Sequence, residues 1–123
     1  MASPTPAQIT DQLATFYYAS LSGDRSQLAN IYKDGSTLSW EGAQFQGPPA
    51  ILEKIKAFPE GVQFKVTTKD FQICGDKMLV LVTGQLITDP NAQPLHFSQS
   101  FVLAGDGVGG FYVANDIFRL NYG

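Results

Sequence analysis

The sequence predicts an α+β fold, in which a curved, mainly antiparallel sheet and three helices enclose a cone-shaped cavity. Apolar residues recur at helical spacing in three segments of the first half of the chain, whereas the second half reads as long strands separated by turn-forming residues. Helices that precede such a run of strands pack on one face of the sheet. A chain of 123 residues is long enough for one domain, spanning residues 1–123.

The first helix is expected from Ser3 to Ser22. Thr5 and Gln8 have the spacing of a capping box, Pro6 suits the first helical turn, and Gly23 ends the helix. One apolar face is formed by Ile9, Leu13, Phe16, Tyr17 and Leu21.

A second, shorter helix is expected from Asp24, which caps it, to Tyr32. Its apolar residues share one side, so Arg25 and Gln27 are expected to face solvent. The segment 33–36 (Lys-Asp-Gly-Ser) then has the composition of a turn.

The chain's one tryptophan, Trp40, lies in a predicted strand that leads into a hairpin at Gly42. Alternation puts Leu38 and Trp40 on one face of this strand and Ser39 and Glu41 on the other. If Trp40 lines the inside of a concave sheet, Glu41 stands near the rim. This pair would then suit a partner that offers both an apolar side chain and a cation.

The third helix is expected to begin at Pro48 and to end at Phe58, before the turn at Pro59. The remaining strands are predicted at Val62–Phe71, Lys77–Thr88, Leu95–Leu103 and Phe111–Leu120. In the first of these, alternation places Phe64, Val66 and Thr68 on one face and Lys65, Thr67 and Lys69 on the other. Aromatic side chains on such strands suggest that a second subunit covers the outer face.

Composition excludes several classes of function. The net charge of −3 argues against a nucleic-acid ligand, because neutralising phosphates requires a surplus of Lys and Arg. Apolar runs are too short for a membrane helix, and the first thirty residues lack the pattern of a secretory signal. Cys74 stands alone, so no internal disulfide is expected and the location is expected to be intracellular.

Enzymatic alternatives rest on few residues. His96, the one histidine, is expected at an exposed or edge position, and Cys74 is expected to be a small buried hydrophobe. A cavity carboxylate that shuttles protons would have to be Asp34, Asp70 or Asp116. For Asp116 a structural role outside the cavity is favoured, paired with Arg119 or a neighbour in the chain.

Short motifs distributed over nearly the whole chain resemble those of the nuclear transport factor 2 family in order and spacing. They are Phe16-Tyr17-Tyr18, Asp24-Arg25-Ser26-Gln27-Leu28, Ile31-Tyr32, Leu38-Ser39-Trp40-Glu41-Gly42, Phe45-Gln46-Gly47, Glu53-Lys54, Gly84-Gln85-Leu86 and Asn115-Asp116-Ile117-Phe118-Arg119-Leu120. The resemblance implies a cone-shaped fold, a homodimer formed through the sheet, no enzymatic activity and no cofactor. It also implies a carrier that takes the small GTPase Ran, in its GDP form, into the nucleus while touching Phe-x-Phe-Gly repeats of nucleoporins. Such a carrier is expected in the cytoplasm and the nucleus, enriched at the nuclear pore.

The resemblance also implies site residues. In the family an aromatic side chain of a Ran switch loop enters the cavity, and the matching wall positions are Trp40, Phe58, Val62, Leu86, Leu95, Ile117 and Phe118. Family acids at the rim pair with basic residues of Ran, and Glu41 and Asp89 match two of them.

Two positions depart from the family pattern. Asn91 stands where the family often has a second acid beyond Asp89, so one charge pair is missing. Pro6 stands where the family uses an aromatic residue to bind nucleoporin repeats, and it offers less contact area. Two other functions remain open: a dimeric scaffold of messenger-RNA export, and a small-molecule isomerase or dehydratase that uses the cavity with Asp34 or Asp116.

Overall fold

The computed structural model describes residues 4–107 and 110–121 and confirms the α+β class. Its elements are α1 (Pro6–Ser22), the 3₁₀ helix η1 (Arg25–Ile31), β1 (Tyr32–Trp40), β2 (Ala43–Gln46), α2 (Pro48–Ala57), β3 (Gln63–Cys74), β4 (Lys77–Ile87), β5 (Leu95–Gly105) and β6 (Phe111–Asn121). Within these residues, no helix combines the length and the apolar character needed to cross a membrane.

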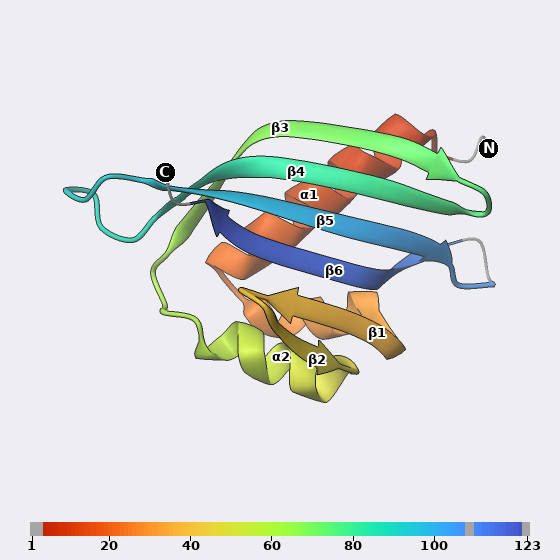
Figure 1. The fold of residues 1–123 in the computed structure, drawn as a ribbon, viewed down its shortest axis with the longest axis horizontal. Helices are drawn as coiled ribbons and strands as arrows, with labels where there is room; N and C mark the ends of the chain where they lie inside the picture. Colours follow the sequence, from red (N-terminus) through yellow and green to blue (C-terminus); the bar gives the residue numbers. More distant parts are fainter. Residues whose placement is uncertain (1–3, 108–109, 122–123) are drawn as a thin grey trace.

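One curved sheet joins the strands in the order β2-β1-β6-β5-β4-β3. Every neighbouring pair is antiparallel except β1 and β6, which run parallel. α1 crosses one face of the sheet obliquely, and α2 lies beside β1 and β2 (Figure 1). The apolar core fills the space between these helices and the inward face of the strands.

The start of α1 confirms the predicted capping box. The Thr5 hydroxyl accepts a hydrogen bond from the Gln8 backbone N–H (3.2 Å), and the Thr5 N–H donates to the Gln8 side chain (2.8 Å). The helix begins at Pro6, and Gly23 follows its last residue. The predicted start at Ser3 lies outside the described residues, as do residues 108 and 109 of the predicted β5–β6 turn.

Residues 33–36 form part of β1, so the predicted turn there is wrong. Ser36 is fully buried, and its hydroxyl donates to the Val113 carbonyl oxygen of β6 (2.6 Å) and accepts from the Lys33 N–H (2.9 Å). A register shift between β1 and β6 accompanies this contact. Turn-forming residues therefore accommodate an irregularity inside a strand here.

β3 contains a register shift between Val66 and Thr68 that reverses the predicted alternation beyond it. Thr68 and Thr83 share a hydroxyl hydrogen bond, and Lys69 turns toward α1, where it pairs with Asp11 (2.7 Å). The predicted faces of Thr68 and Lys69 are therefore wrong.

Gly84 allows β3, β4 and β5 to approach closely. A Cβ atom at this position would overlap the Lys65 carbonyl oxygen and would lie 2.9 Å from the Phe97 ring. The absent side chain therefore leaves space for Phe97 on the inward face of the sheet.

Candidate functional site

Five aromatic rings gather where β1 ends and β3 begins, and we call them the aromatic cluster. They are Trp40, Phe58, Phe64, Phe97 and Phe118. They come from β1, the end of α2, β3, β5 and β6, so the cluster forms only when the sheet and α2 come together.

Trp40 packs against two other rings of the cluster, Phe118 and Phe58. Its ring stacks on Phe118 with 4.1 Å between centroids, because the parallel register of β1 and β6 places the two residues side by side. The Phe58 ring approaches Trp40 edge-on at 5.3 Å. Trp40 is 4% exposed and Phe118 is fully buried, whereas Phe58 is half-buried. Phe58 therefore covers Trp40 and presents the cluster to the outside.

Three other predicted wall residues lie near this end: Leu86 and Leu95 on the inward face of the sheet, and Val62 just before β3. Val62 and Leu86 are buried, and Leu95 is 39% exposed opposite Leu86 where β4 and β5 end. Ile117 contradicts the expectation, because it is 52% exposed and alternates with the buried Phe118. Its side chain therefore lies on the outer face and cannot share the inner wall with Phe118.

Phe64 and Phe97 were not among the predicted wall residues. Phe64 lies 5.8 Å from Phe97 and 6.1 Å from Phe58, between ring centroids. The alternating pattern of each strand indicates an inward position for both residues. The pattern does not indicate that β3 and β5 bring them to the same end of the sheet.

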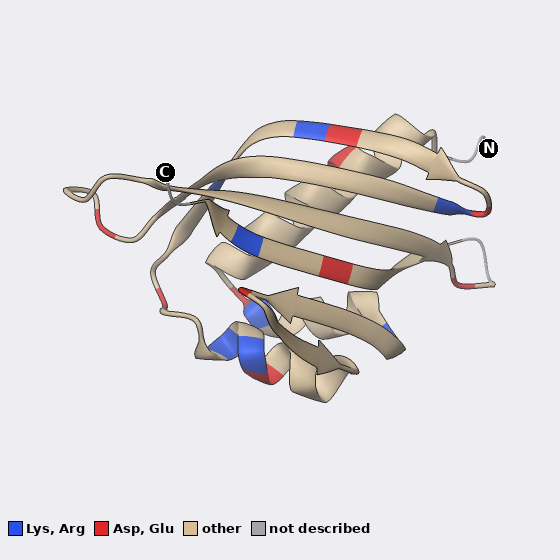
Figure 2. Ribbon diagram, viewed as in Figure 1, with Lys and Arg blue, Asp and Glu red and all other residues tan. Residues whose placement is uncertain are grey.

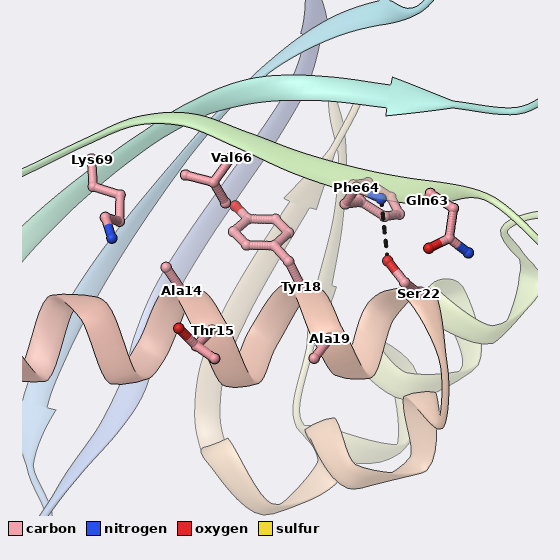
Figure 3. A pocket seen from close by; sticks show the side chains of 9 residues that line it. All are labelled: Ala14, Thr15, Tyr18, Ala19, Ser22, Gln63, Phe64, Val66 and Lys69. Atoms are coloured by element: carbon pink, nitrogen blue, oxygen red, sulfur yellow. Dashed lines mark hydrogen bonds between the residues drawn. The ribbon is translucent and has the colours of Figure 1, made fainter.

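A groove of about 340 Å³ between α1 and β3 is lined in part by Phe64 of the cluster (Figure 3). The Phe64 N–H donates to the Ser22 hydroxyl at the end of α1 (3.2 Å), which fixes β3 against the helix. The Tyr18 ring lies 6.0 Å from Phe64 and 5.5 Å from Phe97. Tyr18 therefore connects the cluster with the polar centre of the core.

Glu41 occupies the β1–β2 turn beside the cluster. With Gly42 it forms a two-residue hairpin loop, and both residues have positive φ (53° and 92°). The Glu41 N–H donates to the Phe118 carbonyl oxygen (3.1 Å), and its carboxylate accepts from the Leu120 N–H. One carboxylate oxygen thus holds the end of β6, and the half-buried side chain stays next to the aromatic rings.

Asp89 and Asn91 lie in the β4–β5 loop, and both are exposed. The Asp89 carboxylate accepts from the Asn91 N–H (2.9 Å), which makes Asp89 a turn-forming residue. The β4–β5 loop, the β1–β2 turn and the α2–β3 connection lie at the same end of the molecule (Figure 1), and acidic positions occur on each (Figure 2). We call these three connections the rim.

A buried polar network occupies the middle of the core. The Asp116 carboxylate accepts from Tyr32 (2.7 Å), Gln99 (2.7 Å) and Tyr17 (3.3 Å). The Tyr18 hydroxyl donates to the Gln99 side chain at 2.7 Å. Burial raises the pKa of Asp116 to about 6, although the hydrogen bonds from Gln99, Tyr32 and Tyr17 oppose the shift.

Asp116 is 1% exposed, so its predicted position outside the cavity, beside Arg119, is wrong. β6 alternation places Asp116 on the same face as Phe118, and Arg119 lies on the opposite face. The tyrosine and glutamine partners enclose the carboxylate from α1, β1 and β5.

The other candidates for enzymatic chemistry are scattered. His96, Asp34 and Asp70 are exposed, on β5, β1 and β3. Cys74 is exposed at the end of β3, so the expectation of a buried thiol is wrong. No group of three or more possible metal-ligating side chains occurs in residues 4–107 and 110–121.

Pro6 is exposed at the first turn of α1, the end of that helix away from Gly23 and the rim (Figure 1). Any contact made by Pro6 is therefore separate from contacts made by the aromatic cluster.

Comparison with known proteins agrees with this geometry. Residues 9–120 match the family model described as the Nuclear transport factor 2 (NTF2) domain. The chain is 43% identical to nuclear transport factor 2 of Emericella nidulans, over 93% of this chain and 94% of the relative. It is 44% identical to nuclear transport factor 2 of Saccharomyces cerevisiae, over 93% of each chain.

A solved structure shows the same relationship. Nuclear transport factor 2 from Cryptosporidium parvum superimposes with a TM-score of 0.87 at 39% identity, covering 98% of both chains. Sequence, fold and length all agree, and the chain therefore belongs to the nuclear transport factor 2 family.

Proposed function

We propose that this protein is a nuclear import carrier that binds Ran in its GDP form and Phe-x-Phe-Gly repeats of nucleoporins, and moves Ran through the pore. Relatives that are 43% and 44% identical over 93% of the chain carry the name nuclear transport factor 2. The observation that carries the proposal is the aromatic cluster beside an acidic rim. A carrier with this task divides its time between the cytoplasm and the nucleus.

The aromatic cluster suits an aromatic side chain of Ran. A ring that packs beside the half-buried Phe58 and Phe64 meets aromatic side chains there, with about 2 kcal/mol gained from burial. Glu41 and Asp89 then face basic residues around that ring. Charges at a rim orient the partner and raise the association rate as much as they raise affinity.

The names of the relatives and the contacts of Asp116 both favour a carrier over a cavity enzyme. Close relatives are named as transport factors. Asp116, the carboxylate that a cavity enzyme would use, is enclosed by three hydrogen-bonding side chains. Its contacts suit a structural group that holds α1, β1, β5 and β6 together.

The test is a binding comparison with Ran loaded with GDP or with GTP. The protein is expected to bind the GDP form at least about tenfold more tightly, a difference of about 1.4 kcal/mol. Equal affinity for both forms, or none for either, would refute the proposed cargo. Binding of a Phe-x-Phe-Gly peptide in the same assay, compared between wild type and Pro6→Trp, tests the second partner. The larger ring is expected to strengthen that binding.

We also propose a homodimer formed through the outer face of the sheet. The alternation of β4 and β6 exposes Leu79 (36%), Leu81 (39%) and Ile117 (52%) on this face. These apolar side chains are suited to a second copy of the chain.

Ile117→Asp is expected to convert the dimer to a monomer, because an isolated carboxylate in an apolar interface loses its hydration. Sedimentation should then give about the mass of one chain, 13.4 kDa, in place of twice that mass. Ile73→Asp is the matched control. Ile73 is 60% exposed near the β3–β4 turn, and it pairs with the inward-facing Met78, so it lies on the other face of the sheet from the proposed interface. A monomeric wild type, or a dimeric Ile117→Asp variant, would exclude this interface.

A further inference from the structure

Arg25 occupies an unexpected position at the junction of the helices. It was expected to face solvent, yet it is only 8% exposed. Its Nε donates to the Leu21 carbonyl oxygen (2.9 Å) in the last turns of α1. Its Nη1 donates to the carbonyl oxygens of Ile55 (3.1 Å) and Phe58, and its Nη2 donates to that of Pro59 (2.7 Å). One guanidinium therefore joins the ends of α1 and α2.

The carbonyl groups also stabilise the charge of Arg25. In the described part of the chain, no carboxylate lies within ion-pair distance of this guanidinium. The carbonyl oxygens at the C-terminal ends of helices carry partial negative charge, and two such ends meet here. Only a planar group with several donors can serve carbonyls from both helices at once.

Arg25 also contacts the ring that covers Trp40. Its Cζ lies 5.8 Å from the centroid of the Phe58 ring, while its Nη1 holds the Phe58 carbonyl. Arg25 thus contacts both the backbone and the side chain of Phe58. The Phe58 ring also packs against Trp40, with 5.3 Å between the ring centroids.

We propose that Arg25 is a positioning residue for partner binding, which holds the Phe58 ring against Trp40 at the entrance to the aromatic cluster. The inference rests on the proposed function, because the partner's aromatic side chain enters beside Phe58. Arg25 itself acts through Phe58 and does not touch the partner. A lysine at this position keeps the charge but cannot reach carbonyls on both helices in the fixed geometry of a guanidinium.

The first measurement is the fluorescence of Trp40, the chain's one tryptophan. Arg25→Lys is expected to shift the emission to longer wavelength, since a released Phe58 exposes the indole to water. Lys56→Met is the control, because Lys56 is an exposed cation near the end of α2 with no part in these hydrogen bonds. Emission that stays unchanged in Arg25→Lys would overturn the inference.

The second measurement is a double-mutant cycle for binding of Ran loaded with GDP, made at a temperature at which each variant is folded. Arg25→Lys is expected to weaken binding about tenfold in the wild-type background and less than about twofold when Phe58 is alanine. An equal loss in both backgrounds would overturn the inference, because Arg25 would then act independently of Phe58. If Arg25→Lys acted only by lowering the stability of the protein, binding would weaken equally in the two backgrounds.

A third measurement uses the wild-type protein, so it does not depend on a variant that folds. The Nε–H signal of Arg25 in nuclear magnetic resonance spectra is expected to shift when Ran loaded with GDP is added, because an aromatic ring that enters beside Phe58 changes the magnetic field at the neighbouring guanidinium without touching it. An unshifted signal at saturation would contradict the inference. If the wild type fails to bind Ran, the proposed cargo is wrong, and the Trp40 fluorescence still decides whether Arg25 positions Phe58.

Discussion

Glu41→Lys is expected to weaken binding of Ran in its GDP form by about 100-fold or more. Glu41 stands beside the aromatic cluster, and a lysine there would face basic residues of the partner. The departure at Asn91 leaves fewer acids on the rim, which increases the share of the attraction that Glu41 provides. Titration calorimetry at moderate salt would measure the loss.

The structure adds a second effect of this substitution. The Glu41 carboxylate accepts a hydrogen bond from the Leu120 N–H, so lysine leaves that donor unpaired. We expect Glu41→Lys to lower the free energy of unfolding by about 2 kcal/mol, more than an ordinary surface change.

Glu41→Gln separates the two effects. Glutamine keeps an oxygen acceptor for the Leu120 N–H but carries no charge. It is expected to retain most of the wild-type stability and to weaken binding about tenfold. Wild-type affinity in both variants would exclude Glu41 as a contact for the partner's cation.

Asp116 is expected to make the stability of the protein fall as pH rises from about 4 to about 6. The folded-state pKa of Asp116 is raised from 3.8 to about 6, chiefly because burial disfavours the charged carboxylate. Between these values the unfolded chain has released the proton while the folded protein still holds it, so a rise in pH favours unfolding. The Asp116 contribution is therefore largest below about pH 4 and is lost through about pH 6.

The shift of about two pH units corresponds to about 3 kcal/mol in the free energy of unfolding. Urea titrations of wild type and Asp116→Asn at several pH values would measure it, since asparagine does not titrate. The difference between the two proteins is expected to change by about that amount from pH 4 to pH 7 and to remain constant above. Asp70→Asn, at an exposed position, serves as the control and should keep the wild-type dependence. A constant difference across the range would show that folding does not raise the pKa of Asp116.

Local patterns predicted the elements whose determinants are close in sequence. The capping box of Thr5 and Gln8 defines the start of α1, and Pro48 and Pro49 start α2. Alternation placed Leu38 and Trp40 together on one face of β1, and both are buried. Helical and strand periods are local properties, so a single sequence contains them.

Other features depend on which strands meet and in what register. The parallel pairing of β1 with β6 brings Trp40 to Phe118, and the irregularity in β3 turns Lys69 toward α1. The resemblance implied that both Ile117 and Phe118 line the cavity wall, but neighbours on a strand face opposite sides, and the burial of Phe118 leaves Ile117 on the outer face. A shift of one residue in register exchanges the two faces of a strand.

The sequence by itself therefore determined the fold class, the main helices and strands and, through its motifs, a resemblance to one family. Only the tertiary structure decided the positions of the charged residues in the interior. Asp116 is held by Tyr17, 99 residues away in the chain, and Arg25 by carbonyls as far as Pro59, 34 residues away. A charged side chain can be buried only when groups from other elements compensate the lost hydration, and only the folded chain brings those groups together.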